Sequence, residues 1–395
     1  MRIFPLASIL AAAMVSLTMP VFADVQFSLG DFEKVSAPRF SMISAGGSMF
    51  GKLSLSPDFK LGPVDLGIDT NLYIPLTTGG YYPAEFNSFV LRRIAYDHDR
   101  IAGIEYGRLQ NVTYGQGLLM NSYDSGAGGE TNEFSNEKAG TKGYVRLYDV
   151  TVKAMYTASN VKAARITYDT PLEMMGVPVV AGATYVTDED GLDKKFDGKQ
   201  VKRPSQSGYA VDVAYPLGGD FMTVYSEYAK LENYSDGVSA GVRGDLLGMF
   251  GYKAEFRTFG EKFVPEYFNR AYEATSFATT DMPGKTLTGF LVSAYGNVMG
   301  DYVRLGAELE MYEDRNLLSA ALGWQRLWDT AGVVNYKVPF QSGQSILSYE
   351  IVRYTDGPVD YVTSWKQVTN KDTKTESYSV GLRFNLHKMF PKFPF

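Results

Sequence analysis

The feature that most constrains this chain is the alternation of apolar residues with polar or small ones along many separate segments. In residues 378–386, an apolar side chain occupies every second position, with serine, glycine, arginine and asparagine between them. The same period of two recurs over 209–215, 252–257 and 303–311. Since successive side chains of a β-strand point to opposite faces, each segment predicts a strand with one apolar and one polar face.

Alternation alone does not separate a soluble β-sandwich from a membrane β-barrel, because both have strands with two unlike faces. The aromatic content favours the barrel. The chain has 28 Tyr, 24 Phe and 3 Trp, several of them at expected strand ends, such as Trp324, Trp328 and Tyr354. Aromatic residues gather at membrane interfaces. The 40 Gly residues, scattered through strands as well as turns, suit a strongly curved sheet.

Residues 1–23 have the organisation of a secretory signal peptide. Arg2 precedes an apolar core at 9–15, and Val21-Phe22-Ala23 forms a small-residue exit. A retained anchor helix is the alternative, but spanning a bilayer takes about 20 apolar residues. We therefore expect cleavage before Asp24, and residues 24–395 to form one domain, because no interdomain linker interrupts them.

After residue 23 no stretch has the composition of a transmembrane helix, and the mean hydropathy of the chain is −0.15. A membrane-spanning form of this chain would have to cross with strands. The chain has no cysteine, which excludes disulfides and thiolate metal sites.

Connection lengths fall into two sets. Those at 57–63, 171–176, 216–220, 245–248 and 298–301 are short, and those at 110–142, 188–206 and 260–285 are long. Outer-membrane barrels have short periplasmic turns and longer outer loops, so the long connections are predicted to be outside. Counting strands between these markers gives an even number of about 16–20. Two segments stay ambiguous: 143–157 is one strand or a hairpin at Tyr148-Asp149, and 25–33 is or is not a first strand.

In this pattern the chain resembles bacterial outer-membrane β-barrels of the general porin type over essentially all of 24–395. Residues 378–386 look like the last strand of that family, although the tail 387–395, with two prolines, departs from its usual terminal phenylalanine. The resemblance implies an all-β fold, a single closed antiparallel transmembrane barrel in the outer membrane. It also implies contact with outer-membrane lipid and the barrel assembly machinery, and a possible homo-oligomer.

The leading functional hypothesis is a porin-like channel for small polar solutes, because a barrel of this strand number encloses more space than its side chains fill. The alternatives are a non-conducting structural or adhesive barrel and, less favoured, a barrel hydrolase. Charged residues at alternate positions would line the lumen, where they either orient solutes or merely pair with one another. The predicted pore-lining residues are Lys253, Glu255, Arg257, Arg304, Glu308, Glu310, Lys337 and Arg383.

Two long connections carry more apolar surface than a solvated loop tolerates. Residues 112–120 are apolar and glycine-rich, and 263–273 are aromatic, with Pro265 suited to the first turn of a short helix. Both are predicted to fold inward, where they constrict or cap the pore. The alternative for 263–273 is that it packs onto a ligand. The residues expected to constrict or cap the pore are Val112, Tyr114, Leu118, Phe263, Tyr267, Phe268 and Tyr272.

Other chemistry has little support in the sequence. The only histidines are His98 and His387, which leaves few bases for an enzyme. Asp97 and Asp99 flank His98, but a solvated turn is the simpler interpretation of that cluster. The acidic loop at 188–197 contains lysines and lacks calcium-loop spacing. We therefore expect no enzyme, cofactor, metal or nucleic-acid partner.

Overall fold

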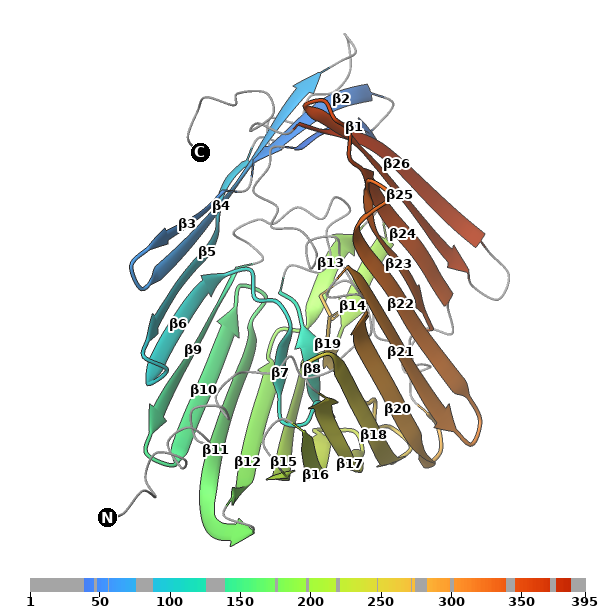
Figure 1. The fold of residues 1–395 in the computed structure, drawn as a ribbon. Helices are drawn as coiled ribbons and strands as arrows, with labels where there is room; N and C mark the ends of the chain where they lie inside the picture. Colours follow the sequence, from blue (N-terminus) through green and yellow to red (C-terminus); the bar gives the residue numbers. More distant parts are fainter. Residues whose placement is uncertain are drawn as a thin grey trace. The chain divides into compact units, whose positions relative to one another are not determined.

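The computed structural model of the chain (Figure 1) describes residues 39–384 except 46–47, 56, 76–87, 126–138, 175–176, 197–198, 218–220, 247, 271, 274–282, 299–301, 339–344 and 370–373. The expected signal peptide, the ambiguous segment 25–33 and the tail 387–395 lie outside the described residues. Within the described ranges every regular element is a β-strand.

No helix among the described residues has the length and apolarity needed to cross a bilayer. The described chain divides into two compact units. The first comprises residues 95–294 and 308–316, and the second comprises the residues before 95, 295–307 and those from 317 onward.

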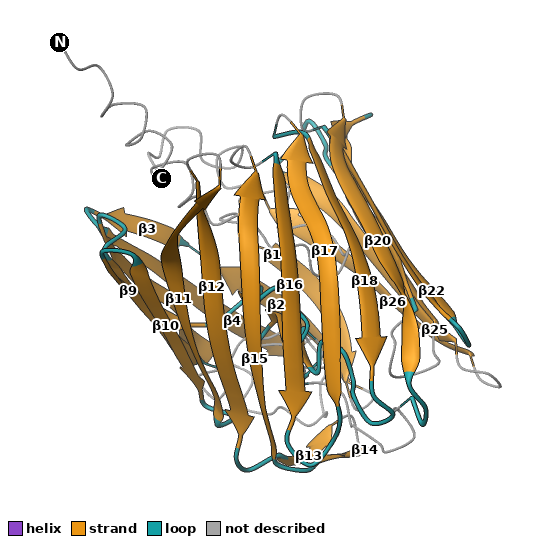
Figure 2. Cartoon of the chain, turned by 90° about the horizontal axis from the view of Figure 1, so that it is seen from below, coloured by secondary structure: helices purple, strands orange, loops and turns teal. Residues whose placement is uncertain are grey.

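The first unit is built on a long run of antiparallel strands, each paired with the next along the chain. Figure 2 shows β15 to β18 of this run side by side. The strands are β6 (Ala102–Gly107), β9 (Gly140–Leu147), β10 (Val150–Thr157), β11 (Val161–Met174), β12 (Val177–Asp188), β15 (Gln206–Leu217), β16 (Met222–Leu231), β17 (Asp236–Leu246) and β18 (Phe250–Phe259). The neighbouring elements are β5 (Ser88–His98), β20 (Leu287–Val298) and β21 (Val303–Tyr312).

The second unit joins the two ends of the described chain. Strands β22 to β26 are each paired antiparallel with the next along the chain. Strand β26 also pairs with β1, where Phe40 lies opposite Leu382. From β1 the ladder continues to β2 and β4. The strands are β1 (Arg39–Ala45), β2 (Ser48–Leu55), β3 (Asp58–Leu61), β4 (Val64–Pro75), β22 (Asn316–Leu327), β23 (Thr330–Lys337), β24 (Ser345–Arg353), β25 (Val359–Thr369) and β26 (Lys374–Phe384).

The two faces of the strands differ in exposure: one face carries exposed apolar side chains and the other carries buried charged ones. Alternation in the sequence does not by itself show which face is exposed. On β15, Val211 and Val213 are 50% and 51% exposed, whereas Asp212 between them is 4% exposed. On β18, Phe256 is 44% exposed while its neighbours Glu255 and Arg257 are buried. A soluble sandwich would bury the valines and expose the charges. On these strands the apolar side chains are therefore on the exposed face and the charged side chains on the buried face.

The strand bounds settle one segment that the sequence left ambiguous, show a hairpin within one long connection and correct one predicted short connection. Residues 143–157 form a hairpin, β9–β10, whose tight turn holds Tyr148 at φ +52°. The long connection 188–206 contains its own hairpin, β13 (Leu192–Phe196) with β14 (Lys199–Arg203). The connection 57–63 is mostly strand, because β3 continues to pair with β4 up to the turn at Gly62.

Candidate functional site: inward-folded loops on a buried ionic network

The two apolar long-loop segments meet in one small sheet within the first unit. Strand β7 (Val112–Tyr114) pairs with β8 (Met120–Tyr123), and β19 (Phe268–Asn269) lies parallel to β8. Figure 1 shows β7, β8 and β19 beside the strands of the wall. All seven residues predicted for the constriction are buried: Val112, Tyr114, Leu118, Phe263, Tyr267, Phe268 and Tyr272.

The short helix expected after Pro265 is not formed in the described residues 260–270. Glu266 adopts φ +53°, outside the right-handed helical region, so the chain turns there instead. The N–H groups of Glu266 and Phe268 donate to the carbonyls of Leu118 and Leu119 at 2.8 and 3.2 Å. These two N–H groups therefore bond to carbonyls of the first loop instead of to carbonyls within a helix.

Aromatic packing reinforces this junction. Phe263 stacks on Phe259 of β18 with ring centroids 5.5 Å apart, and Phe268 lies 4.9 Å from the ring of Tyr272. Tyr267 contacts both Phe268 and Tyr272, at 5.1 and 5.7 Å. The aromatic side chains thus pack with one another and with the wall, as their apolar surface requires.

Polar contacts fix the far ends of the two loops. The Tyr123 hydroxyl donates to Glu273 at 2.5 Å, and Ser159 after β10 donates to the same carboxylate at 2.8 Å. Burial raises the pKa of Tyr123, and the neighbouring Glu273 raises it further, so the hydroxyl remains a donor. Tyr272 donates to Asp188 at the end of β12, at 2.7 Å.

An ion pair between Arg165 and Asp212 on neighbouring strands of the sheet holds the tip of the first loop. Arg165 of β11 binds both carboxylate oxygens of Asp212 of β15, at 2.6 and 3.0 Å. Thr184 accepts another hydrogen bond from Arg165 at 2.9 Å. Gln116, in the loop, donates its side-chain amide to Asp212 at 2.8 Å. A bidentate arginine–carboxylate pair is among the stronger hydrogen-bonded arrangements, so Asp212 is a fixed point for the loop.

Glu227 of β16 completes this attachment. One oxygen of its carboxylate accepts the backbone N–H groups of Gln116 and Leu118, at 3.1 and 2.8 Å. The loop can approach this closely only because residue 115 is glycine: a Cβ there would lie 2.1 Å from the other Glu227 oxygen. Gly115 also has φ +78°, a conformation that suits glycine.

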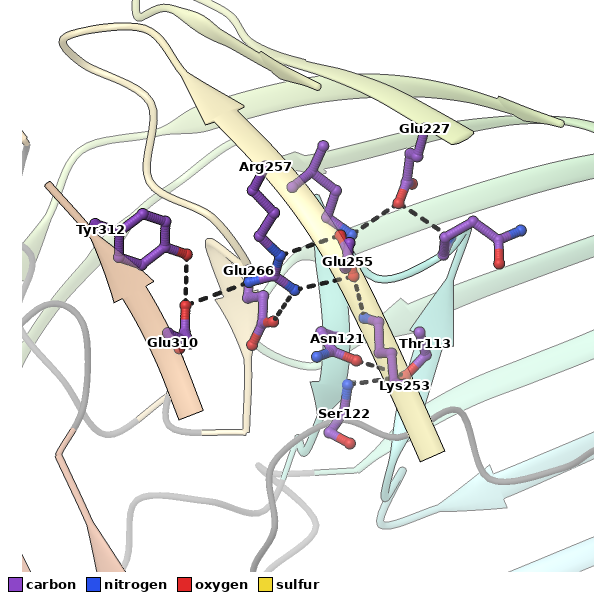
Figure 3. A network of polar contacts seen from close by, with 12 residues as sticks. Thr113, Asn121, Ser122, Glu227, Lys253, Glu255, Arg257, Glu266, Glu310 and Tyr312 are labelled. Atoms are coloured by element: carbon purple, nitrogen blue, oxygen red, sulfur yellow. Dashed lines mark hydrogen bonds and ion pairs between the residues drawn. The ribbon is translucent and has the colours of Figure 1, made fainter. Parts of the chain in front are cut away.

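A second network surrounds Glu255 on β18 (Figure 3). Its carboxylate pairs with Lys253 at 2.7 Å and Arg257 at 3.1 Å, and accepts the Tyr225 hydroxyl at 2.9 Å. Arg257 also reaches Glu266 of the second loop at 3.2 Å and Glu310 of β21 at 3.4 Å. Each loop is therefore tied to the wall by charge, the first through wall acids and the second through a wall arginine.

The structure brings together four of the predicted pore-lining residues, Lys253, Glu255, Arg257 and Glu310. Arg304, Glu308 and Lys337 are half-buried, and each has a polar interaction. Arg383 is placed on β26, but its side chain lies outside the described residues. The pairing interpretation thus describes the first four.

The sequence analysis did not identify the residues that attach the first loop to the sheet. These are Arg165, Asp212 and Glu227 on the strands, and Gln116 in the loop itself. Asp212 had a visible signal, since it interrupts the small inward residues of 209–215. Arg165 and Glu227 occupy inward positions of the same kind. Nothing in the local pattern indicates which loop they contact, because their partners are up to 111 residues away in sequence.

The other polar clusters considered in the sequence have ordinary structural partners. Asp97 accepts the Tyr144 hydroxyl and, at 3.0 Å, the backbone N–H of Arg100 in the turn after β5. Asp188 accepts the N–H of Gly191 at 2.9 Å. Across the described ranges, no three His, Asp or Glu residues are grouped as metal ligands.

Comparison with known proteins gives only distant structural likeness. No family model matches the chain, and no curated protein matches it. Two of the similar solved structures, Wzi and OpdK, are described as outer-membrane proteins. Wzi of Escherichia coli, described as a carbohydrate-binding β-barrel involved in capsule assembly, has a TM-score of 0.38 at 10% identity, over 89% of this chain and 85% of its own. OpdK and OccK2 of Pseudomonas aeruginosa have TM-scores of 0.34 and 0.37 at 10% and 11% identity, over 88% of this chain and 96% and 95% of theirs.

Proposed function

We propose that this protein is a channel of the bacterial outer membrane through which small polar solutes diffuse. The observation that carries the proposal is the facing of the sheet: exposed valines at 211 and 213 on either side of buried Asp212, and exposed Phe256 beside buried Arg257. Apolar side chains such as valine and phenylalanine are favoured in contact with lipid, and charged side chains such as aspartate and arginine are favoured in an aqueous or polar interior. The wall thus separates an apolar exterior from a charged interior.

The pairing of β1 with β26 supports a single closed barrel with an even number of strands. In lipid every backbone N–H and C=O must be paired, and an open sheet would leave two unpaired edges. The ladder from β26 to β1, Arg39 opposite Arg383, gives the first and last described strands a partner. Short turns would then face the periplasm, and the long connections the cell exterior.

The filter of this channel would be the pair of inward-folded loops. Residues 112–123 and 263–273 place buried apolar surface against the wall, and the carboxylates of Glu266 and Glu310 remain partly exposed at 24% and 16%. Solutes passing the loops would meet these charges together with Arg257. We propose that this neighbourhood, not the strands far from it, sets which solutes pass.

The test is single-channel recording on purified protein in a planar lipid bilayer. Replacing 112–120 with a Gly/Ser linker should raise conductance and weaken solute selectivity, while the strands stay assembled because their hydrogen bonds do not involve that loop. The matched control replaces 232–233, in the polar turn after β16, with Gly-Ser and should leave conductance unchanged. A folded wild type that never conducts would overturn the proposal.

A non-conducting structural or adhesive barrel is the second candidate. The observation in its favour is that the two loops are anchored to several wall strands, at Asp188, Asp212, Glu227 and Arg257, as a permanent plug would be. The same recording separates the two candidates. A plugged barrel would conduct only after replacement of 112–120, whereas a channel conducts with the loop in place.

A further inference from the structure

Lys153 of β10 carries a positive charge that no acid in the described part of the chain neutralises. It lies on the face of the strands that holds the buried charged side chains, here called the inner face, together with buried Met155. Its neighbour Val152 is exposed on the opposite face. Lys153 is half-buried and has no hydrogen-bond or ion-pair partner among the described residues. Since partial burial of an unpaired charge costs free energy, this lysine does not serve the stability of the sheet.

The strands on both sides of Lys153 bring further positive charge to it. The register places Lys153 directly opposite Arg165 of β11. Lys142 of β9 lies opposite Met155, the next inward residue of β10. The charged side chains that act on Lys153 are these two cations, and no acid is among them. Like charges directly opposite each other destabilise a sheet, so the pairing of Lys153 with Arg165 has no structural benefit.

The acids beside this group are already engaged by the other two cations. Arg165 binds both carboxylate oxygens of Asp212, at 2.6 and 3.0 Å. Lys142 lies 3.5 Å from the carboxylate of Glu105. Three cations therefore share two carboxylates, and the positive charge that is left over is that of Lys153.

Arg243 of β17 provides a comparison on the same inner face. It too has no hydrogen bond or ion pair within the described residues, but its surroundings differ. Its guanidinium carbon lies 5.5 Å from the centre of the Tyr225 ring, a cation–π contact, and the acids Asp212 and Glu227 act on it. The protein thus compensates the charge of Arg243 in part, whereas it surrounds Lys153 with cations.

From this imbalance we infer that Lys153 is a binding subsite for the anionic group of a solute that passes through the channel. The inference rests on the proposed function, in which the inner face borders the path of the solute. One surplus positive charge fits a singly charged oxyanion such as a carboxylate. A phosphate ester, which carries close to two negative charges, would exceed it. An ammonium group binds such an anion by a charge-assisted hydrogen bond.

The subsite lies next to the first loop, which the proposed function makes part of the filter. Gly115 of that loop faces Arg165: a Cβ on Gly115 would lie 3.6 Å from the arginine Nη1. Lys153 is the residue directly opposite Arg165 on the neighbouring strand. An anion bound at Lys153 would therefore stand beside the constricted part of the path, where its binding affects the current.

Ion permeation through the purified protein in planar lipid bilayers tests the subsite. The current carried by potassium acetate is recorded at rising concentrations, and the reversal potential in an acetate gradient gives the permeability to acetate relative to potassium. The variants are Lys153→Met, which removes the charge, and Lys153→Arg, which retains it. Lys162→Met is the matched control, because it removes a lysine whose ion pair with Glu189 is exposed.

The wild-type acetate current should saturate, as a binding site requires. In Lys153→Met it should rise in proportion to concentration, with the relative acetate permeability lowered severalfold, while Lys153→Arg and Lys162→Met resemble the wild type. The urea midpoint of Lys153→Met should equal or exceed that of the wild type, because the substitution removes a contact between like charges.

Three results would overturn the inference. The first is a conducting wild type whose acetate current does not saturate, or saturation that persists in Lys153→Met. The second is a lowered urea midpoint or failed assembly of Lys153→Met, which would show that the lysine has a structural role. The third is inorganic phosphate saturating at a lower concentration than acetate, which would contradict the singly charged ligand. A folded wild type that never conducts would instead overturn the proposed function.

Discussion

The carboxylate of Glu227 accepts the backbone N–H of Leu118 at 2.8 Å, so strand β16 holds a loop segment that lies more than a hundred residues earlier in the chain. The same oxygen accepts the N–H of Gln116. Glu227 is 1% exposed, and its two backbone donors are neutral. The position of the loop and the burial of this carboxylate therefore depend on each other, because water does not reach the buried carboxylate or the two buried N–H groups to take the place of these hydrogen bonds.

Glu227→Ala should release the tip of the first loop. Two backbone N–H groups would lose their acceptor, and a buried unsatisfied group costs about 1–3 kcal/mol. We expect noisier single-channel currents, faster cleavage near residues 115–120 by an added protease, and a barrel that still folds. Glu232→Ala, in the exposed turn that follows the same strand, is the control and should behave as the wild type. Quiet currents and protease resistance in Glu227→Ala would show that other contacts suffice to hold the loop.

Breaking the Arg165–Asp212 pair from one side should be more costly than removing both partners. Asp212→Ala leaves a buried guanidinium without its carboxylate, and the loss of one partner of a buried pair costs about 3–5 kcal/mol. The double variant Arg165→Met with Asp212→Leu should recover much of this loss in urea unfolding of vesicle-inserted protein. Lys162→Ala, which removes an exposed ion pair to Glu189, is the control and should leave the urea midpoint close to that of the wild type.

The facing of β15 predicts a sharp difference between the outer surface and the strand end. Val211→Arg places a charge on the exposed apolar face and should destabilise the inserted protein by about 2–4 kcal/mol if it lies near the bilayer midplane. Glu232→Arg, at the polar end, should be neutral. The measurement is the urea midpoint of folding into vesicles. Tolerance of arginine at 211 together with loss of stability at 232 would mean that the outward face has been assigned wrongly.

The strands could be predicted from the sequence because their signal is local. The alternation at 209–215 and 252–257 marks both the strand and the residues that share each face, and β15 and β18 follow it. The alternation by itself does not give the sign of the facing, since a period of two is the same whichever face is buried. The inward placement of charged residues is predicted from the membrane-barrel interpretation, and the exposure of Val211 and burial of Asp212 agree with it.

The loop segments were found by their composition, but their contacts were not. An excess of apolar residues at 112–120 and 263–273 indicates burial without indicating where. The conformation of 263–273 depends on carbonyls of Leu118 and Leu119, which lie about 150 positions earlier in the chain and prevent the helix that Pro265 favours. Long-range pairing of this kind overrides local propensity.

Gly115 and Gly248 provide a matched pair that isolates the closeness of the loop to the wall. Both are glycines with positive φ, +78° and +66°, but a Cβ at 248 would meet nothing within 4 Å, whereas one at 115 would overlap Glu227. Gly248→Ala should therefore cost only the backbone strain of a left-handed residue, about 1–2 kcal/mol. Gly115→Ala adds the collision, so it should displace the loop tip and reproduce the noisy currents of Glu227→Ala. Combining Gly115→Ala with Glu227→Ala should add little to either change alone, because the two act on one contact. Additive effects on protease cleavage would show that the glycine and the carboxylate hold the loop independently.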